Sequence, residues 1–214
     1  MLAARLYADA HEVDARLVPF GVSRKELIEV VRGVVAARAD AVENDPMTAE
    51  GLFAYIYGTR FLRSLFRTKG WLLHRENSIE SVSHPERLQR IIYQSVDLAA
   101  SRSQKPQAVS GKGSASDRII AEAQGALFTE EELEAAARAP RFAGINAGVW
   151  YLCVSVNGED VRAELSLPSA VEGGNFKDFI ERIFIVGADE WPGLAVEPES
   201  RGDVVEFEPV ISRK

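Results

Sequence analysis

The chain has 214 residues, of which 46% are hydrophobic and 27% are charged, a composition that suits one large or two small globular domains and excludes disorder throughout. No apolar stretch approaches the roughly 20 residues of a membrane-spanning helix, and the single cysteine, Cys153, excludes an internal disulfide and a multi-cysteine zinc site. Residues 1–9 lack the apolar region of a signal peptide. Together these features predict a cytoplasmic protein.

The net charge of −7 is distributed unevenly along the chain. Residues 1–59 carry a net charge of −3, while residues 60–118 contain 11 basic and 5 acidic residues and carry +6. Residues 119–214 contain 8 basic and 18 acidic residues and carry −10. A basic segment of this kind is typical of polyanion binding. The alternative is that the basic and acidic parts face each other once the chain is folded.

The first third of the chain predicts three helices. Apolar residues recur at spacings of four and three over residues 2–17, which form one helical stripe. Ser23 and Glu26 have the spacing of a capping box and open a second helix, which Asn44–Pro46 ends. Residues 48–68 form the predicted third helix, with Thr48 as its N-cap.

The middle of the chain changes character after Gly70, where β-prone runs alternate with turn residues. Short strands are predicted at residues 71–74, 79–82 and 88–96. A serine- and glycine-rich stretch without acidic residues follows and predicts an exposed loop. This loop spans residues 101–116, and predicted helices follow it at residues 117–124 and 129–140.

The last third of the chain is predicted to be mostly β. The continuous apolar run over residues 149–156 indicates a central strand, and Asn157-Gly158 is a strong hairpin signal. Apolar and polar residues then alternate over residues 161–167, which predicts a strand with one face in solvent, so that Glu164 lies on the wet side. The remaining expectations are a helical turn at residues 175–180, a strand at 183–186 and a last strand at 204–210.

These elements predict an α+β fold. We expect an N-terminal helical layer of three helices, followed by a mostly antiparallel sheet with short inserted helices. The expected division is a helical region at residues 1–69 and a β-rich region at residues 70–214 that carries the basic loop 101–116. The two regions can equally form one continuous domain.

The strongest candidate for binding chemistry is a basic stripe on the third helix. Arg60, Arg63 and Arg67 are spaced by three and four residues and therefore share one side of the helix. Guanidinium groups suit bidentate contacts with phosphate, and neighbouring aromatic residues such as Phe66 and Trp71 can stack on unpaired bases. The alternative is an ordinary solvated helix face whose aromatic residues belong to the core.

A second candidate is the stretch Ser110–Arg118, in which small residues surround Lys112. Backbone amides of such a loop approach phosphate closely, and a helix that starts after it adds a favourable dipole. The stretch is not a Walker A loop, because Gln107 stands where the first glycine belongs. A flexible linker is the alternative.

Acidic residues of the last third form a third candidate. Paired carboxylates bind Mg²⁺ for phosphoryl chemistry, and Glu164 and Glu181 are the candidate catalytic residues. An ion-paired surface is the alternative for these acids. His11, His74 and His84 match no recognised metal-ligand spacing, and no catalytic signature motif is present. No metal site and no cofactor is predicted.

We therefore expect a non-enzymatic binding protein that engages nucleic acid or another phosphate-rich ligand through its basic middle segment. Two alternatives remain open: a protein–protein assembly subunit or homo-oligomer that uses the acidic C-terminal third, and a metal-dependent phosphodiester hydrolase. The residues predicted to contact the ligand are Arg60, Arg63, Arg67, Lys69, Trp71, Arg102, Lys105, Lys112 and Arg118.

Overall fold

The computed structural model describes residues 4–76, 79–109, 148–172 and 175–194 of the chain. A seven-stranded mixed sheet forms its centre, with strand order β1-β7-β6-β5-β4-β3-β2. Strands β1 and β7 are parallel, as are β4 and β5, whereas all other neighbours are antiparallel. The strands are β1 (Arg5–Tyr7), β2 (Leu72–Glu76), β3 (Ile79–Ser83), β4 (Gln89–Ser95), β5 (Gly148–Asn157), β6 (Asp160–Glu172) and β7 (Asn175–Val186).

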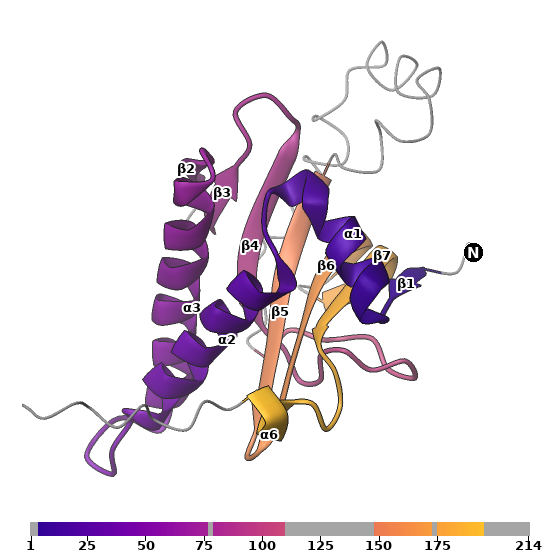
Figure 1. Cartoon of the computed structure of the whole chain (residues 1–214). Coiled ribbons are helices and arrows are strands. Elements are labelled where there is room, and N and C mark those ends of the chain that lie inside the picture. The colour runs from indigo at the N-terminus through magenta and orange to yellow at the C-terminus, as the bar shows by residue number, and fades with distance from the viewer. Residues whose placement is uncertain (1–3, 77–78, 110–147, 173–174, 195–214) are drawn as a thin grey trace, which may run out of the picture.

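The helices that the structure describes lie mainly in the first third of the chain. In Figure 1, α1, α2 and α3 cover the face of the sheet that is turned toward the viewer. The prediction of an α+β fold is thus confirmed at the level of fold class. The helical segments are α1 (Ala10–Leu17), the 3-10 turn η1 (Val18–Phe20), α2 (Arg24–Ala39), α3 (Ala49–Thr68) and the short α6 (Trp191–Leu194).

Local signals explain where α2 and α3 begin and end. The capping box is confirmed: the amide of Glu26 donates to Ser23 Oγ at 3.3 Å, and the amide of Ser23 donates to Glu26 Oε2 at 2.8 Å. Thr48 occupies the N-cap position of α3 but makes no side-chain cap hydrogen bond. Gly70, with φ of +84°, follows the helix in the left-handed conformation that glycine adopts most easily.

The turn between β5 and β6 also follows the sequence prediction. Asn157 pairs with Asp160, and Gly158 has φ of +62°, as a tight hairpin requires. The two strands run antiparallel from this turn, and β5 lies in the middle of the sheet. The predicted central strand and hairpin are therefore confirmed.

Two local predictions are wrong, and one described helix was missed. Residues 5–7 form strand β1 instead of the start of the first helix, because they pair with residues 181–183 of β7. Residues 175–180 belong to the continuous strand β7 and are not a helical turn. The short helix α6 was not predicted. The predicted helices 117–124 and 129–140 and the predicted strand 204–210 lie outside the described residues.

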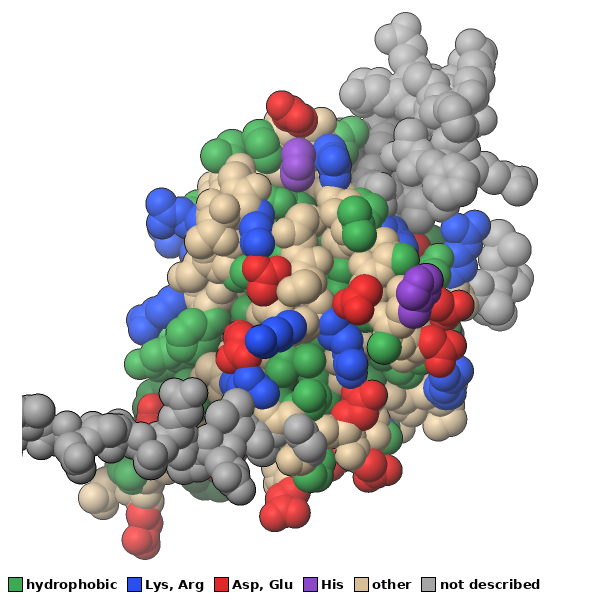
Figure 2. Space-filling view, viewed as in Figure 1, with side chains coloured by type: hydrophobic (Ala, Val, Ile, Leu, Met, Phe, Trp, Pro, Cys, Tyr) green, Lys and Arg blue, Asp and Glu red, His purple; other side chains and the backbone are tan. Residues whose placement is uncertain are grey.

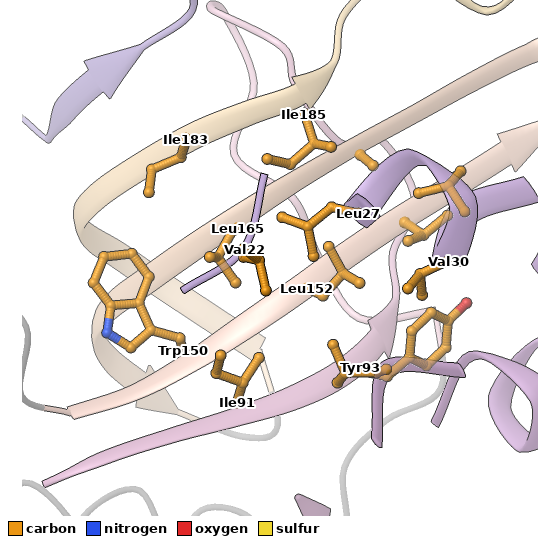
Figure 3. Packing of buried hydrophobic residues seen from close by; sticks show 14 of the residues in the cluster. Val22, Leu27, Val30, Ile91, Tyr93, Trp150, Leu152, Leu165, Ile183 and Ile185 are labelled. Carbon is orange, nitrogen blue, oxygen red and sulfur yellow. The ribbon is translucent and has the colours of Figure 1, made fainter. Parts of the chain in front are cut away.

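The main hydrophobic core lies between the helices and one face of the sheet, which we call the helix face. Trp150, Leu152 and Val154 of β5 point to this face. Figure 3 shows Leu152 and Leu165 of the sheet near Leu27 of α2. These side chains are fully buried, and because apolar burial is the main driving force of folding, this layer fixes the helices on the sheet.

Helix α3 packs closely on both α2 and the sheet because two glycines leave room for aromatic rings. A Cβ atom at Gly33 of α2 would overlap the ring of Phe61, and one at Gly58 of α3 would overlap the ring of Tyr93 in β4. One side of α3 is therefore closed by packing. Its opposite side carries the predicted arginine stripe.

The opposite face of the sheet, which we call the second face, has its own smaller core. Tyr151 and Cys153 of β5 point to it and pack with Phe176 and Phe179 of β7. Residues 97–109, which follow β4, cover part of this face, and Ala99 is fully buried in the cluster. The buried Cys153 thus contributes to packing.

No helix within the described residues is long and apolar enough to cross a membrane.

Candidate functional site

The predicted stripe on α3 lines an open hollow at the edge of the sheet, which we call the arginine hollow. Its volume is about 300 Å³, and it lies between α3 and the edge strand β2. All three predicted arginines of α3 line this hollow, because their spacing places them on one side of the helix. The hollow is lined by Ile56, Thr59, Arg60, Arg63, Ser64, Arg67 and Leu73.

One carboxylate neutralises part of this positive charge. Glu80 of β3 forms ion pairs with Arg63 and with Arg75 of β2. Arg63 and Glu80 are 16% and 20% exposed, whereas Arg75 is 71% exposed. Burial raises the pKa of Glu80, but the hydrogen bond from Arg75 and the charge of Arg63 outweigh it and hold this pKa below its ordinary value. Glu80 is therefore ionised at neutral pH.

Arg60 and Arg67 remain available to a ligand. Both side chains are exposed, and neither forms an ion pair with a carboxylate of the described residues. The guanidinium carbon of Arg60 lies 4.5 Å from the ring centroid of Tyr57, a cation–π contact that orients the group. The Nε atom of Arg63 is buried and has no hydrogen-bond acceptor within the described parts of the chain. The hollow thus contains two exposed guanidinium groups without a carboxylate partner among the described residues.

Two predicted ligand contacts near the hollow serve other roles. Lys69 pairs with Glu26 of α2 at 2.7 Å. Trp71 is 4% exposed, and its ring packs edge-on against the fully buried ring of Phe66 at a centroid distance of 4.8 Å. The expectation that Trp71 or Phe66 stacks on bases is therefore wrong in this fold, since neither ring is accessible.

The other predicted cations that the structure describes lie elsewhere. Arg102 is exposed in the segment that covers the second face. Lys105 in the same segment pairs with Asp178 at 3.0 Å. The arginine hollow lies with α3 on the helix face, so the described cations are divided between two faces of the sheet. Lys112 and Arg118 lie outside the described residues.

The helix face does not present one uninterrupted basic field. Figure 2 shows Lys and Arg side chains interspersed with Asp and Glu side chains over most of this view. Several of these neighbours are ion pairs, such as Arg24 with Glu190 at 2.6 Å and Arg38 with Glu50 at 2.6 Å. Exposed pairs of this kind contribute little to stability. The excess of arginine at the hollow is therefore a local property of α3 and β2.

Glu164, one of the two candidate catalytic residues, is part of a buried ion pair. The prediction that it faces solvent is wrong, because it is fully buried on the second face. Arg182 of β7 donates to both of its oxygens, at 2.9 and 2.6 Å. Ser166 Oγ and the amide of Ala100 donate at 2.6 Å each. Four hydrogen bonds saturate this carboxylate, and a structural role follows.

Arg182 joins this ion pair to the segment that covers the second face. Its Nη1 atom donates to the carbonyl oxygens of Ser101, at 2.9 Å, and Gln104, at 3.3 Å. Ala100, directly before Ser101, has φ of +47°, an unfavourable value for a residue with a Cβ atom. The ion pair therefore holds residues 100–104 in place against the sheet.

Glu181, the other candidate catalytic residue, lies on the helix face, away from Glu164. It is fully buried and pairs with Arg16 of α1, whose guanidinium also lies 5.4 Å from the Trp150 ring. Burial raises the pKa of Glu181, although the Arg16 contact opposes this shift. Because the two glutamates lie on opposite faces, they do not form a common acid pair.

The described residues contain no group of three or more His, Cys, Asp or Glu side chains that could hold a metal ion. His84 accepts a hydrogen bond from the amide of Glu86 at 3.1 Å and packs against Trp71. His74 lies on β2, where Ser81 Oγ is 3.4 Å from its Nδ1 atom. These histidines contribute to local structure at the β2–β3 end of the sheet.

Sequence reasoning missed three residues that matter for these sites. Arg16 and Arg182 bind the buried glutamates, and Leu73 forms part of the arginine hollow. Each contacts residues of a different helix or strand, so periodicity within one segment could not find it. No protein-family model, no curated protein and no solved structure matches the chain.

Proposed function

We propose that the chain is a non-enzymatic, cytoplasmic binding protein that holds a phosphate-rich ligand, such as nucleic acid, in the arginine hollow. The observation that carries this proposal is that Arg60, Arg63 and Arg67 line one open surface while two of them have no carboxylate partner within the described residues. Planar guanidinium groups bind phosphate in a bidentate manner and remain charged at all physiological pH values.

The local charge favours an anion despite the net charge of −7. Arg60, Arg63 and Arg67 line the hollow, and Glu80 pairs with Arg63 and with Arg75 of β2. The site therefore keeps an excess of positive charge. Ile56 and Leu73 add apolar side chains to its lining.

The same geometry favours recognition of phosphates over recognition of bases. Trp71 and Phe66 are buried and cannot stack on a base. Tyr57 is occupied by the guanidinium group of Arg60. We therefore expect binding that depends strongly on salt and only weakly on nucleotide sequence.

Fluorescence anisotropy with a labelled single-stranded oligonucleotide, and with polyphosphate as competitor, tests this proposal. Affinity should fall as salt rises from about 50 to about 200 mM, and the double variant Arg60→Glu/Arg67→Glu should bind at least about tenfold more weakly. Because each lost phosphate contact lowers the salt dependence of single-strand binding by about 0.7 in the log–log slope, the double variant should lose about 1.4.

The matched control is Arg102→Glu/Lys25→Glu, which changes the net charge equally at exposed positions outside the hollow. It should retain most of the affinity. Equal losses in the two double variants would show that binding follows overall charge and would contradict the site. Affinity that is insensitive to salt would contradict phosphate binding itself.

A further inference from the structure

Strand β2 leaves one edge of the sheet open. It pairs with β3 on one side and is the last strand of the sheet order, so its other side presents backbone donors and acceptors without partners among the described strands. It contains no proline, and Leu72 and Leu73 are 56% and 51% exposed. The opposite edge strand, β1, has three residues. The edge of β2 is thus the longer of the two open edges and exposes large apolar side chains.

This edge lies directly beside the arginine hollow. Leu73 points to the helix face, where it lines the hollow together with Ile56. Side chains of a strand alternate between the two faces of a sheet. An additional strand paired with β2 would therefore send every second side chain into the hollow, where apolar groups meet Leu73 and acidic groups meet the arginines.

The charge of the arginine hollow favours an acidic strand over a second copy of β2 as the partner of the β2 edge. If the β2 edges of two copies paired with each other, Arg60 and Arg67 of one copy would approach the same arginines of the other, which is unfavourable. An extended segment with alternating acidic and apolar residues has the opposite charge and the required period.

The chain itself carries such a segment after Leu194. Residues 203–208 read Asp-Val-Val-Glu-Phe-Glu, with three strand-forming residues and no positive charge. Glu206 and Glu208 are two positions apart and would share one face of an extended strand. Residues 195–202 connect this segment to α6, and eight residues span roughly 26–29 Å when fully extended.

We propose that residues 203–208 of a second copy add to the free edge of β2 as an extra strand, with Glu206 and Glu208 in the arginine hollow. This contact links copies of the chain through a basic surface on one and an acidic segment on the other. It uses Arg60 and Arg67, as the proposed function does, but it does not depend on phosphate binding. Bound strand and phosphate ligand would compete for the same arginines.

A charge-swap experiment on the full chain tests this contact by light scattering coupled to size exclusion. The unaltered chain should self-associate with rising concentration, and more weakly at high salt. The variants Glu206→Lys/Glu208→Lys and Arg60→Glu/Arg67→Glu should each lose at least about tenfold in self-association. Mixing these two variants should restore association, because the basic segment of the first then meets the acidic hollow of the second, and the unaltered acidic segment of the second meets the unaltered hollow of the first.

A matched control and a second readout complete the experiment. Glu43→Lys/Glu159→Lys makes the same charge change at exposed positions away from the hollow and should leave association unchanged. Amides of residues 72–76 should exchange hydrogen more slowly in the associated chain than in the Glu206→Lys/Glu208→Lys variant, since strand addition occupies them.

A chain that is monomeric at all concentrations, or a mixture of the two charge-reversed variants that does not associate, would overturn the proposal. Failure of oligonucleotide binding would leave these results unaffected. Conversely, the variant Glu206→Lys/Glu208→Lys keeps the arginines of the hollow and should bind the oligonucleotide at least as well as the unaltered chain. The two proposals can therefore fail separately.

Discussion

Arg182 on the second face and Arg67 on α3 carry the same guanidinium group in opposite surroundings. Arg182 is 7% exposed in its side chain and donates to Glu164 and to two backbone carbonyl oxygens. Arg67 is exposed, lines an open hollow and has no carboxylate partner within the described residues. A buried and saturated charge holds the fold together, whereas an exposed charge without a partner is available for binding.

The largest expected effect on stability concerns the buried ion pair between Arg182 and Glu164. Glu164→Ala should lower the free energy of unfolding by about 3–5 kcal/mol, because it leaves Arg182 buried without its counter-charge. Urea unfolding at neutral pH measures this loss. The double variant Glu164→Leu/Arg182→Met should be more stable than Glu164→Ala, because no uncompensated charge remains. If Glu164→Ala were as stable as the unaltered chain, the ion pair would not be needed to hold residues 100–104.

Helix α3 allows a comparison between a packed position, Gly58, and an open position, Gly51. Gly58→Ala should lower stability by about 1–3 kcal/mol, since the added Cβ atom overlaps the Tyr93 ring. Gly51→Ala in the same helix meets no atom within 4 Å and should raise stability by about 0.5 kcal/mol through helix propensity. Thermal unfolding of both variants checks the difference. Equal effects would indicate that α3 does not pack against β4 through Gly58.

The smallest expected effect concerns an exposed ion pair. The hydrogen bond and charge of Lys69, together with the amide of Ser23, lower the pKa of Glu26 from 4.5 to about 2. A lowered pKa stabilises the fold when the group is ionised, so this contribution is complete above about pH 4.5 and is lost as pH falls toward 2. Because Glu26 is 37% exposed, solvent screening limits the contribution to less than about 1 kcal/mol.

The variant Glu26→Gln removes this titrating group and provides the test. Its stability should be slightly lower than that of the unaltered chain at neutral pH, and the difference should vanish near pH 2. Urea unfolding at several pH values between these limits measures it. A difference that persists unchanged at the lowest pH would contradict the assigned contacts.

Signals that act over a few residues were sufficient to predict part of this fold. The capping box of Ser23 and Glu26 and the Asn157-Gly158 turn are local interactions, and both occur where the sequence places them. The spacing of Arg60, Arg63 and Arg67 predicted that they share one side of the helix, and all three line the hollow. These features depend on backbone geometry within a single element.

Features that depend on distant partners could not be predicted in this way. Residues 5–7 form a strand because β7 pairs with them. Glu164 alternates with apolar neighbours like a solvent-exposed residue, but residues 97–109 and Arg182 cover it. Phe176 and Phe179 are spaced like residues of a helix, yet they pack on the second face of a strand. In each case tertiary contacts override the local pattern.

The order of strands also has a consequence for synthesis of the chain. Leu27 of α2 is buried in a core that includes Ile185 of β7. The ribosome therefore completes α2 long before it makes the strand that helps to cover this helix. Ribosomes add roughly 5–20 residues per second, which leaves the apolar side of α2 uncovered for about 8–30 seconds. During that interval the apolar side of α2 lacks its sheet partner, so chains released before β7 is made are expected to aggregate more readily than the complete chain.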